Sequence, residues 1–504
     1  MRRLRIGVLD LATNAPIRNL YGRLMNANLA SIMPQAVAAW CEQAGHEVCF
    51  ACYTGLQSPV QALPQSLDLL FISAFTQAAQ LAYALSNLFR RRGTVVALGG
   101  PHARSYPEDA SKYFDYVLGL TDRAIILEVL QDCSPHRPSG AYLSASRQPD
   151  ELPAVAERWK FIEPTLACAP LVKLVPMLSS LGCPYTCSFC IDSVVPYHPF
   201  RTQQIVEDLR FLLRKLRRPQ VAWHDPNFGV RFDEIMAAIE EAVPPGRMEF
   251  GAESSLSLLS ESHLTRMAKV GFKALLPGVE SWFAHGEKSK TGSLSGFDKV
   301  KQVSEHAALI LRSVPYLQTN FVLGLDSDEG PLPFELTKRF VDMTPGAFPG
   351  YSLLTAYGRA APQNLEFQRE GRLIPFPFHV LNNNHAMNVR PRHYSWPDFY
   401  DRVIDLTNHS FSLRTVARRF RAARTALPRW MNFVRAVSSE GRGRLRYYRT
   451  VRRLLDTDRS LRRFFDGETA DVPAFYVHRI RRDLGPLWEL LPAGALSSAS
   501  TLCL

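Results

Sequence analysis

The first 130 or so residues alternate between short apolar runs and longer amphipathic stretches. Five runs have the length and composition of buried strands, and they lie at 4–11, 46–53, 67–75, 94–100 and 114–120. Residues 30–45 and 77–92 carry apolar side chains at helical spacing and predict helices. Strands that alternate with helices favour a doubly wound parallel sheet, because a parallel crossover needs a long connection. Ligands of such a sheet lie beyond the carboxyl ends of its strands.

A second alternating region follows. Its strand candidates lie at 174–180, 221–225, 248–254, 273–281, 317–325 and 351–357, and helical patterns separate them. Six strand–helix units are two fewer than a closed eight-stranded barrel contains, so we expect a partial, TIM-like (β/α)6 barrel.

Two other regions break this alternation. Residues 136–165 are rich in proline and polar residues with weak periodicity, so we interpret them as a linker. From residue 376 onward the chain is rich in arginine and aromatic residues and mainly helical in pattern. The expected fold class is therefore α/β. Its expected parts are an N-terminal doubly wound sheet (1–135), the linker, the barrel core (166–375) and a helical, basic C-terminal region (376–504).

The composition is that of a soluble globular protein, with 46% hydrophobic and 21% charged residues. No stretch approaches the roughly 20 apolar residues that span a bilayer, so we expect no transmembrane segment. The N-terminal segment lacks a small-residue cleavage site and predicts a buried strand better than a signal peptide. These features predict a cytoplasmic protein.

Most of the net charge of +12 falls in one segment. Residues 411–490 hold 19 arginines, no lysine and eight acidic residues, a net charge of +11. Such a segment can meet nucleic acid or an anionic membrane surface, or it can be the solvated face of packed helices. Its aromatic residues alternate with arginine as amphipathic packing requires. We therefore expect helices over the end of the barrel and no nucleic-acid partner.

Nine cysteines in a long chain without a secretion signal argue against a disulfide framework. Cys183, Cys187 and Cys190 form a C-x3-C-x2-C cluster after the first predicted barrel strand, with Phe189 in the last gap. Zinc is one candidate, with His198 as the fourth ligand, although this spacing differs from the usual paired ligands. An iron–sulfur cube held by three thiolates leaves one iron open for a substrate or cofactor. The position of the cluster at the functional face favours the cube.

The sequence CPYTCSFC, followed by a six-unit barrel pattern, resembles the cysteine motif of the radical S-adenosylmethionine superfamily. The resemblance implies a 4Fe–4S cluster on the three cysteines, whose open iron binds the amino and carboxylate groups of S-adenosylmethionine. In that superfamily one electron from the cluster cleaves the cofactor, and the resulting 5′-deoxyadenosyl radical removes hydrogen from the substrate. The cofactor carries the hard chemistry, while the protein positions it and excludes water.

The same resemblance implies which strand ends contact S-adenosylmethionine. Asp225 and Asn227 follow the second strand, where the superfamily binds the amino end of the cofactor, although its usual G-G-E is absent here. Glu280 and Ser281 follow the fourth strand, where polar groups meet the ribose. The other expected cofactor contacts are Phe189, Glu253 and Gly278. The alternative for each polar residue is an ordinary capping group at a strand end.

The N-terminal pattern resembles the cobalamin-binding half of cobalamin-dependent radical enzymes, so the resemblance covers roughly residues 1–375. Ser73 and Thr76 follow the third strand, and Gly99 and Gly100 follow the fourth, where the nucleotide tail of cobalamin would thread. The loop after the first strand, DLATNAPIRN, contains no D-x-H-x-x-G. The resemblance therefore implies a bound cobalamin whose cobalt takes no histidine from this chain. The alternative is a sheet domain that binds nothing or guides the substrate.

With this resemblance, the first hypothesis is a radical S-adenosylmethionine enzyme that performs cobalamin-dependent methyl transfer to carbon. The second is a radical cyclisation or rearrangement without methyl transfer. The third is a basic RNA-binding or RNA-modifying protein with a zinc-stapled loop. The expected partners of the enzyme are a small-molecule or lipid-like substrate and an electron donor such as flavodoxin or ferredoxin.

Overall fold

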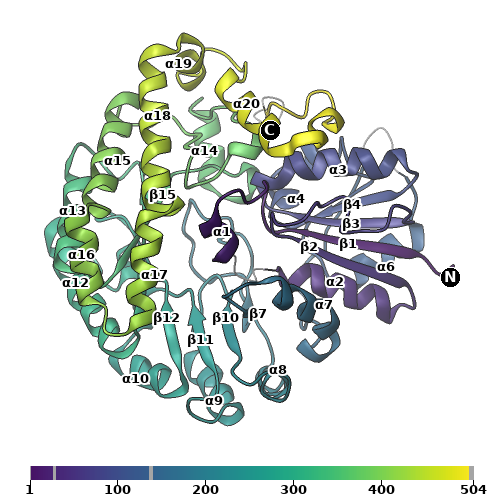
Figure 1. Cartoon of the computed structure of the whole chain (residues 1–504), viewed down its shortest axis with the longest axis horizontal. Helices are drawn as coiled ribbons and strands as arrows, with labels where there is room; N and C mark the ends of the chain where they lie inside the picture. The colour runs from purple at the N-terminus through teal and green to yellow at the C-terminus, as the bar shows by residue number, and fades with distance from the viewer. Residues whose placement is uncertain (1, 26–29, 136–139, 499–504) are drawn as a thin grey trace.

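The computed structural model describes residues 2–25, 30–135 and 140–498 (Figure 1). Its N-terminal part is a parallel six-stranded sheet in the order β2-β1-β3-β4-β5-β6. The strands are β1 (Arg5–Leu11), β2 (Glu47–Tyr53), β3 (Leu69–Ala74), β4 (Val95–Gly99), β5 (Tyr116–Leu118) and β6 (Ala141–Leu143). The order of the first five is flavodoxin-like and reverses between β1 and β3, the point where such sheets bind ligands. The predicted doubly wound sheet is confirmed.

Helices cover both faces of this sheet, as parallel sheets require. α2 (Ile32–Gln43) and α6 (Arg123–Asp132) lie on one face, and α3 (Ala79–Arg91) lies on the other. Three shorter helices complete this part of the chain: α1 (Leu20–Leu24), α4 (Pro101–Ser105) and α5 (Pro107–Ala110).

The expected linker at 136–165 differs from the structure. Residues 136–139 lie outside the described residues, but β6 pairs with β5 as the sixth strand. α7 (Val155–Cys168) packs against α2 and contains Pro164. A three-residue strand is too short to show a two-residue period, and an internal proline argues against a helix. The sequence pattern therefore did not predict β6, because it is short, or α7, because it contains a proline.

The second part of the chain is a parallel sheet that Figure 1 shows as an open arc. Its path is β7 (Leu174–Met177), β10 (Gln220–Trp223), β11 (Glu249–Ala252), β12 (Phe272–Leu275), β14 (Tyr316–Leu323) and β15 (Phe348–Leu353). β7 and β15 are its two edges, so the predicted partial barrel is confirmed. Outside it lie α8 (Thr202–Lys215), α9 (Phe232–Ala242), α10 (Glu261–Val270), α12 (Gly296–Ser313) and α13 (Leu332–Met343).

The fourth predicted strand, 273–281, is broken in two. β12 ends at Leu275, and β13 (Gly278–Glu280) pairs separately with β14. Pro277 lies in the gap and has no N–H to donate to a strand ladder. The break turns the chain at the mouth of the barrel.

The inner face of the barrel carries small or polar side chains. Along β10, β11, β14 and β15, buried residues alternate with less buried ones. The buried residues pack under the helices, and the less buried residues form a second set that faces the lumen. That set includes Ala222, Gly251, Gln318, Asn320, Gly350 and Ser352. A Cβ on Gly350 would approach the side chains of Gln318 and Asn320, so these three residues share one face. Small and polar side chains therefore line the lumen of the barrel.

The C-terminal region is helical, as predicted. It contains α14 (Gln363–Arg369), α15 (Trp396–Ser410), α16 (Leu413–Ala422), α17 (Ala426–Val437), α18 (Arg444–Thr457), α19 (Arg459–Phe465) and α20 (Ala474–Leu484). Arg419 Nε donates to the Ala347 carbonyl at 3.1 Å, and Arg435 Nη1 donates to Gln318 Oε1 at 2.8 Å. α16 and α17 thus cover the end of the barrel where β14 and β15 begin.

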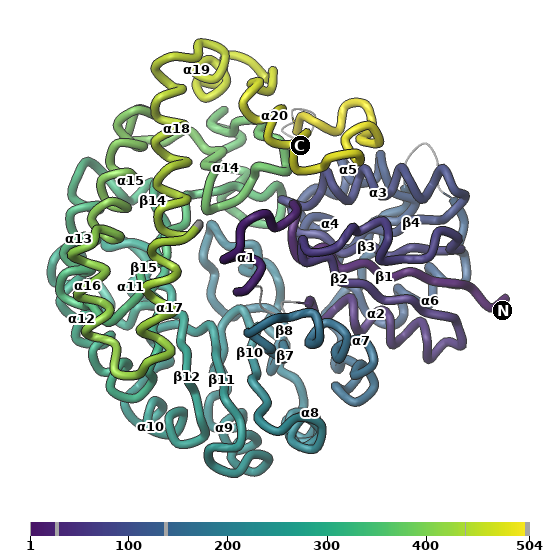
Figure 2. Tube along the Cα trace, in the orientation of Figure 1, coloured from purple at the N-terminus to yellow at the C-terminus, as the bar shows by residue number. Residues whose placement is uncertain are grey.

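The last described segment returns to the N-terminal sheet. Figure 2 shows it beside α3, where Gln80 Nε2 donates to the carbonyls of Ala495 and Leu496, both at 2.9 Å. One hydrophobic cluster runs from the α3 face of the sheet through the barrel to the C-terminal helices. Among the described residues, no helix is both long and apolar enough to cross a bilayer.

Candidate active site

The three cysteines lie on one loop beyond the carboxyl end of β7. The loop leaves β8 (Ser180–Leu181) and returns through β9 (His198–Pro199), which pairs with β8 in antiparallel fashion. Gly182 opens the loop with φ at 69°, and a Cβ there would overlap the carbonyl oxygens of Val195 and Pro196. Only glycine fits this left-handed, crowded position. The β8–β9 pairing and this glycine therefore close the loop at its base.

Contacts with two other elements fix the loop. The hydroxyls of Tyr185 and Ser257 form a hydrogen bond of 2.7 Å, which connects the loop to the segment after β11. The Gln363 N–H donates to the Ser188 carbonyl at 3.1 Å at the start of α14. Cys183, Cys187 and Cys190 are all partly buried between these anchors.

The surroundings of the three thiols favour their protonated form. Burial raises the pKa of all three, to about 11 for Cys190. In the part of the chain that the structure describes, no three His, Cys, Asp or Glu side chains are grouped closely enough to hold one metal ion. His198, the zinc ligand considered above, instead pairs with Asp150 at 3.5 Å. The assignment of the three thiols to a four-iron cube, in which each thiolate binds a different iron, stays a prediction.

Phe189 and Lys288 connect the loop to the fourth strand unit. The Phe189 ring meets His285 edge-on at 5.2 Å, and His285 directly precedes α11 (Gly286–Ser289). On that helix, Lys288 Nζ donates to Glu280 Oε1 at 2.6 Å. Burial opposes the charge of Lys288, but Glu280 and the thiols of the loop hold its pKa above the usual value. Lys288 was missed in the sequence because its glycine- and serine-rich segment has no period that distinguishes it from Lys290.

Gly278 and Glu280 form a strained strand end. Glu280 has φ at 66°, a left-handed conformation that is costly for a residue with a side chain. A Cβ on Gly278 would collide with the Glu280 carboxylate and approach Lys288 Nζ. The glycine therefore makes room for the Glu280–Lys288 pair at the mouth of the barrel.

Asp225 joins the first two strand ends. It is almost fully buried, and its carboxylate accepts hydrogen bonds from the Ser179 N–H at 3.0 Å, the Ser179 hydroxyl at 2.6 Å and the Ser180 hydroxyl at 2.8 Å. These bonds hold the chain just before the cysteine loop. The contact with S-adenosylmethionine that the sequence predicts for Asp225 is untested and stays a prediction.

Asn227 is the predicted residue with the most to offer a ligand. Its side chain is 3% exposed, and neither its Oδ1 nor its Nδ2 has a hydrogen-bond partner among the described residues. A buried, unpaired amide costs free energy unless a ligand or water satisfies it. Asn227 thus offers a free donor and acceptor near the strand end where the sequence predicted the cofactor.

Glu253 and Ser281 differ in their freedom. Glu253 is exposed, yet desolvation by the surrounding protein raises the pKa of its carboxyl. The Ser281 hydroxyl donates to Asp328 Oδ1 at 2.6 Å and accepts from the Phe283 N–H at 3.0 Å. Ser281 therefore caps the strand end. The ribose contact expected of it is untested and stays a prediction.

The predicted cobalamin residues lie together at the carboxyl edge of the N-terminal sheet. Gly100 has φ at 92°, and a Cβ there would lie 3.0 Å from the Ala74 carbonyl oxygen and 3.1 Å from Ser73 Oγ. A Cβ on Gly99 would meet no described atom within 4 Å, so open space adjoins it. Thr76 is buried. The edge thus offers a cradle with one open side, which fits an inserted ligand.

His102 and Phe75 complete this edge. His102 is fully buried, and its Nε2 lies 2.6 Å from the Tyr83 hydroxyl. Burial lowers the pKa of His102 to about 3. The His102 ring is thus buried and hydrogen-bonded within the protein. Phe75 directly follows β3 and is 48% exposed. Its exposure was not predicted, because an apolar residue at the end of a strand is usually part of the core.

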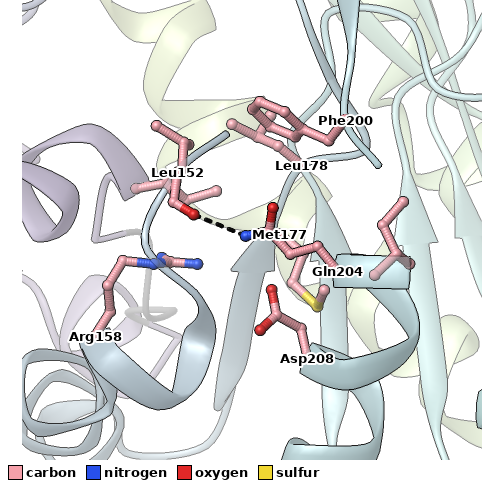
Figure 3. Close-up of a pocket in the computed structure, with 9 residues that line it drawn as sticks. Leu152, Arg158, Met177, Leu178, Phe200, Gln204 and Asp208 are labelled. Atoms are coloured by element: carbon pink, nitrogen blue, oxygen red, sulfur yellow. Dashed lines mark hydrogen bonds between the residues drawn. The ribbon is translucent and has the colours of Figure 1, made fainter. Parts of the chain in front are cut away.

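A cavity of about 20 Å³ lies elsewhere, between α2, α7 and α8 (Figure 3). Gln204 Nε2 donates across it to the Leu152 carbonyl at 2.8 Å, and Arg158 and Asp208 border it. This volume holds about one water. The cavity is a packing gap and not the active site.

No protein-family model matches the chain. Three curated relatives are similar in sequence. The bacteriochlorophyllide d C-12(1)-methyltransferase of Chlorobaculum tepidum is 23% identical over 348 residues, which are 66% of this chain and 68% of the relative. The C-8(2)-methyltransferase of the same organism is 24% identical over 42% of this chain and 50% of the relative. An uncharacterised Synechocystis methyltransferase is 24% identical over 60% of this chain and 56% of the relative.

Solved structures share this fold over most of the chain. The cobalamin-dependent S-adenosylmethionine radical enzyme OxsB, with aqua-cobalamin bound, matches with a TM-score of 0.56 and 13% identity over 97% of this chain and 80% of OxsB. The radical S-adenosylmethionine methyltransferase TsrM of Kitasatospora setae, with cobalamin and a [4Fe-4S] cluster bound, matches with a TM-score of 0.52 and 13% identity over 73% of this chain and 78% of TsrM. These likenesses confirm the predicted resemblance, and the chain has the fold of cobalamin-dependent radical S-adenosylmethionine enzymes.

Proposed function

We propose that this protein is a cobalamin-dependent radical S-adenosylmethionine methyltransferase that methylates a carbon of a small-molecule substrate. The observation that carries the proposal is the closed three-thiol loop at the mouth of a polar, open barrel, in a chain that also has a sheet edge with an open cradle. Bound in these places, the cluster would supply the electron that cleaves S-adenosylmethionine, and cobalamin would supply the methyl group.

The residues of the mouth would divide the work of binding. Cys183, Cys187 and Cys190 would hold the cluster, and the positive charge of Lys288 would lie beside their thiolates. The unpaired Asn227 amide would bind a polar group of S-adenosylmethionine. Glu253 and the residues of the inner face of the barrel would border the substrate. A site closed to water favours radical chemistry, because water cannot react with the intermediates.

The sheet edge would hold cobalamin without a histidine from this chain. The open side of Gly99 would admit the nucleotide tail, and Ser73 and Thr76 would border it. We also propose that the four regions predicted from the sequence are functional units, with one change to their boundaries. Because β6 belongs to the first sheet and α7 is a helix, the N-terminal unit extends through β6 and the linker is only the segment between β6 and α7.

The names of the three relatives favour methyl transfer over a radical cyclisation or rearrangement. Two of them methylate bacteriochlorophyllide d, so a small-molecule or lipid-like substrate suits the same class here. TsrM was solved with tryptophan, another small molecule. An electron donor such as flavodoxin or ferredoxin would reduce the cluster, and we propose the cytoplasm as the site of action.

Anaerobic reconstitution tests the proposal. The wild-type protein should bind one 4Fe–4S cluster and one cobalamin, and methyl-labelled S-adenosylmethionine should transfer its label to a substrate found by product mass spectrometry. Replacing all three cysteines by alanine should remove iron, sulfide and the brown chromophore while cobalamin binding remains. A triple variant with full iron and sulfide would contradict the cluster assignment. Cleavage of S-adenosylmethionine without labelled product, across substrates that the protein demonstrably converts, would favour the cyclase alternative.

A further inference from the structure

The α16–α17 hairpin carries an exposed surface in which apolar side chains and arginines are mixed. We call it the hairpin face and define it by Leu413, Arg414, Arg421, Leu427, Trp430 and Phe433. Leu413 is 73% exposed, Leu427 66% and Trp430 56%. On α17 the exposed residues recur at positions 426, 427, 430 and 433, the spacing of one helical stripe. α17 thus exposes Leu427, Trp430 and Phe433 along one stripe, and exposed apolar patches mark interaction sites.

The aromatic residues of the hairpin face are held in place. The Phe420 ring packs edge-on against Trp430 at 5.2 Å and against Phe433 at 6.2 Å. The Arg429 guanidinium lies 5.3 Å from the centre of the Phe420 ring. The two helices thus present these rings as one rigid surface, which reduces the ordering cost of docking.

The charge of the hairpin selects the partner. Residues 411–437 contain seven arginines, no lysine and no acidic residue. Arg418 pairs with Asp342 at 2.8 Å, and Arg419 is buried. Among the described residues, neither Arg414 nor Arg421 has an ion-pair partner, and both are exposed. The unpaired positive charge of these two arginines is complementary to an anionic partner.

Three kinds of partner can be compared: a second copy of this chain, a nucleic acid and an anionic lipid bilayer. A second copy of the same face would bring arginines against arginines, which is unfavourable. Nucleic acid would neutralise the arginines and could stack on Trp430, but it offers no apolar phase to the aliphatic side chains of Leu413 and Leu427. A bilayer with anionic lipids accepts all three kinds of group: arginine at the phosphates, tryptophan at the interface and leucine below it.

We propose that the hairpin face docks the protein peripherally on an anionic lipid surface. Arg419 contacts Ala347 at the start of β15, so the hairpin covers the barrel end opposite the cysteine loop. Docking through this face leaves the mouth of the barrel free. The inference does not depend on the methyltransferase proposal, because it uses none of the residues of the mouth.

Co-sedimentation of the full chain with lipid vesicles tests the inference. The protein should bind vesicles of phosphatidylglycerol and phosphatidylcholine in equal parts, should not bind pure phosphatidylcholine, and should dissociate as salt rises. Arg414→Gln with Arg421→Gln should weaken binding about thirtyfold, as the loss of two surface charges predicts. Leu413→Ser with Leu427→Ser should weaken it about tenfold or more, because the apolar anchor is lost.

Matched variants keep the test decisive. Leu365→Ser with Arg369→Gln removes an exposed leucine and arginine from α14 and should bind vesicles like the wild type. The four hairpin positions are exposed, so thermal unfolding should stay unchanged in both hairpin variants. The inference is overturned if wild-type protein ignores anionic vesicles, or if both hairpin variants bind as the wild type does. It is equally overturned if the arginine variant loses binding to an RNA duplex while vesicle binding persists.

Discussion

At the scale of single residues, the candidate active site depends on positions where a side chain is missing or unpaired. Gly182 and Gly278 stand where a Cβ would collide with other atoms, one at the base of the cysteine loop and one beside the Glu280–Lys288 pair. Asn227 has a buried amide without a partner among the described residues. These features have a free-energy cost in the protein alone, so each is a specific point at which substitution separates folding from ligand binding.

We expect Gly182→Ala to impair cluster binding. A residue with a Cβ is strained at φ 69°, and the overlap with the Pro196 carbonyl forces the loop open. At limiting iron, cluster occupancy should fall about tenfold, which corresponds to a strain of 1–3 kcal/mol. Iron and sulfide analysis after anaerobic reconstitution measures this. Gly45→Ala is the control, since its φ is also positive at 89° but open space surrounds it. Equal iron in wild type and Gly182→Ala would contradict the role of this glycine.

The Asp10→Asn variant should change how stability depends on pH. Burial raises the pKa of Asp10 to about 6 from 3.8, although the Ser31 N–H at 2.6 Å favours the ionised form. The folded state therefore keeps a proton that the unfolded state releases between about pH 4 and 6. The free energy of unfolding should fall by about 3 kcal/mol over this range as pH rises, and then level off.

An asparagine cannot ionise, so Asp10→Asn should lack this part of the fall. Thermal or denaturant unfolding at several pH values, compared with the wild type, isolates the Asp10 contribution from those of Asp208 and Asp328, whose pKa values are raised to about 6 by burial as well. The exposed Asp471→Asn serves as the control and should run parallel to the wild type. A parallel course for Asp10→Asn would show that the buried carboxyl is not protonated.

At the scale of elements, strand ends decide where ligands bind. In the barrel, Pro277 splits the fourth strand, and the β8–β9 ribbon closes the cysteine loop. In the N-terminal sheet, the ends of β3 and β4 form the cradle in which Gly99 and Gly100 play different parts. Gly100 is required by its backbone, whereas Gly99 borders open space, so only Gly99 permits a clean test of ligand insertion.

Gly99→Trp should therefore block cobalamin binding without unfolding the sheet. The indole would occupy the open side of the cradle, and we expect at least about a tenfold loss of affinity from the overlap. Equilibrium dialysis of the cluster-containing protein with hydroxocobalamin measures it. Gly99→Ala adds a single methyl to the same open space and should bind nearly as the wild type does. If Gly99→Trp takes up cobalamin normally, the ligand lies elsewhere or the edge is only a scaffold.

At the scale of the whole molecule, the parts share one core. The hydrophobic cluster that starts on the α3 face of the N-terminal sheet includes residues of the barrel and of α18 to α20. Gln80 is fully buried at the contact between α3 and the last described segment, and its Oε1 also accepts from the His379 N–H at 3.0 Å. The C-terminal region thus works as a clamp that joins the sheet to the barrel.

We expect Gln80→Leu to loosen this clamp. Leucine is similar in size to glutamine, but it leaves the Ala495 and Leu496 carbonyls and the His379 N–H without their partner. Unsatisfied buried groups cost about 1–3 kcal/mol each before relaxation, so a loss of about 3 kcal/mol is expected. Limited proteolysis should release the C-terminal segment first. Gln61→Leu, at an exposed glutamine, should leave both stability and proteolysis unchanged; a stable, protease-resistant Gln80→Leu would show that the clamp lies elsewhere.

The sequence was sufficient for features that depend on local pattern. The strands of both sheets and the helices between them follow from apolar periodicity, and the cysteine triad follows from spacing within eight residues. Periodicity failed where elements were short or contained proline, as at β6, α7 and the break at Pro277. It also could not distinguish a strand-end capping group such as Ser281 from a free one such as Asn227.

The features that needed the folded molecule all depend on approach between distant segments. Lys288 joins the site because α11 packs against the cysteine loop through His285 and Phe189. Gly182 is obligatory because the chain 13 and 14 residues later passes directly beside it. The hydrogen bonds of the Asp225 carboxylate with Ser179 and Ser180 were likewise not visible in the sequence. Such contacts leave no period or spacing in the sequence, since only the closing of the sheets brings these atoms within a few ångströms.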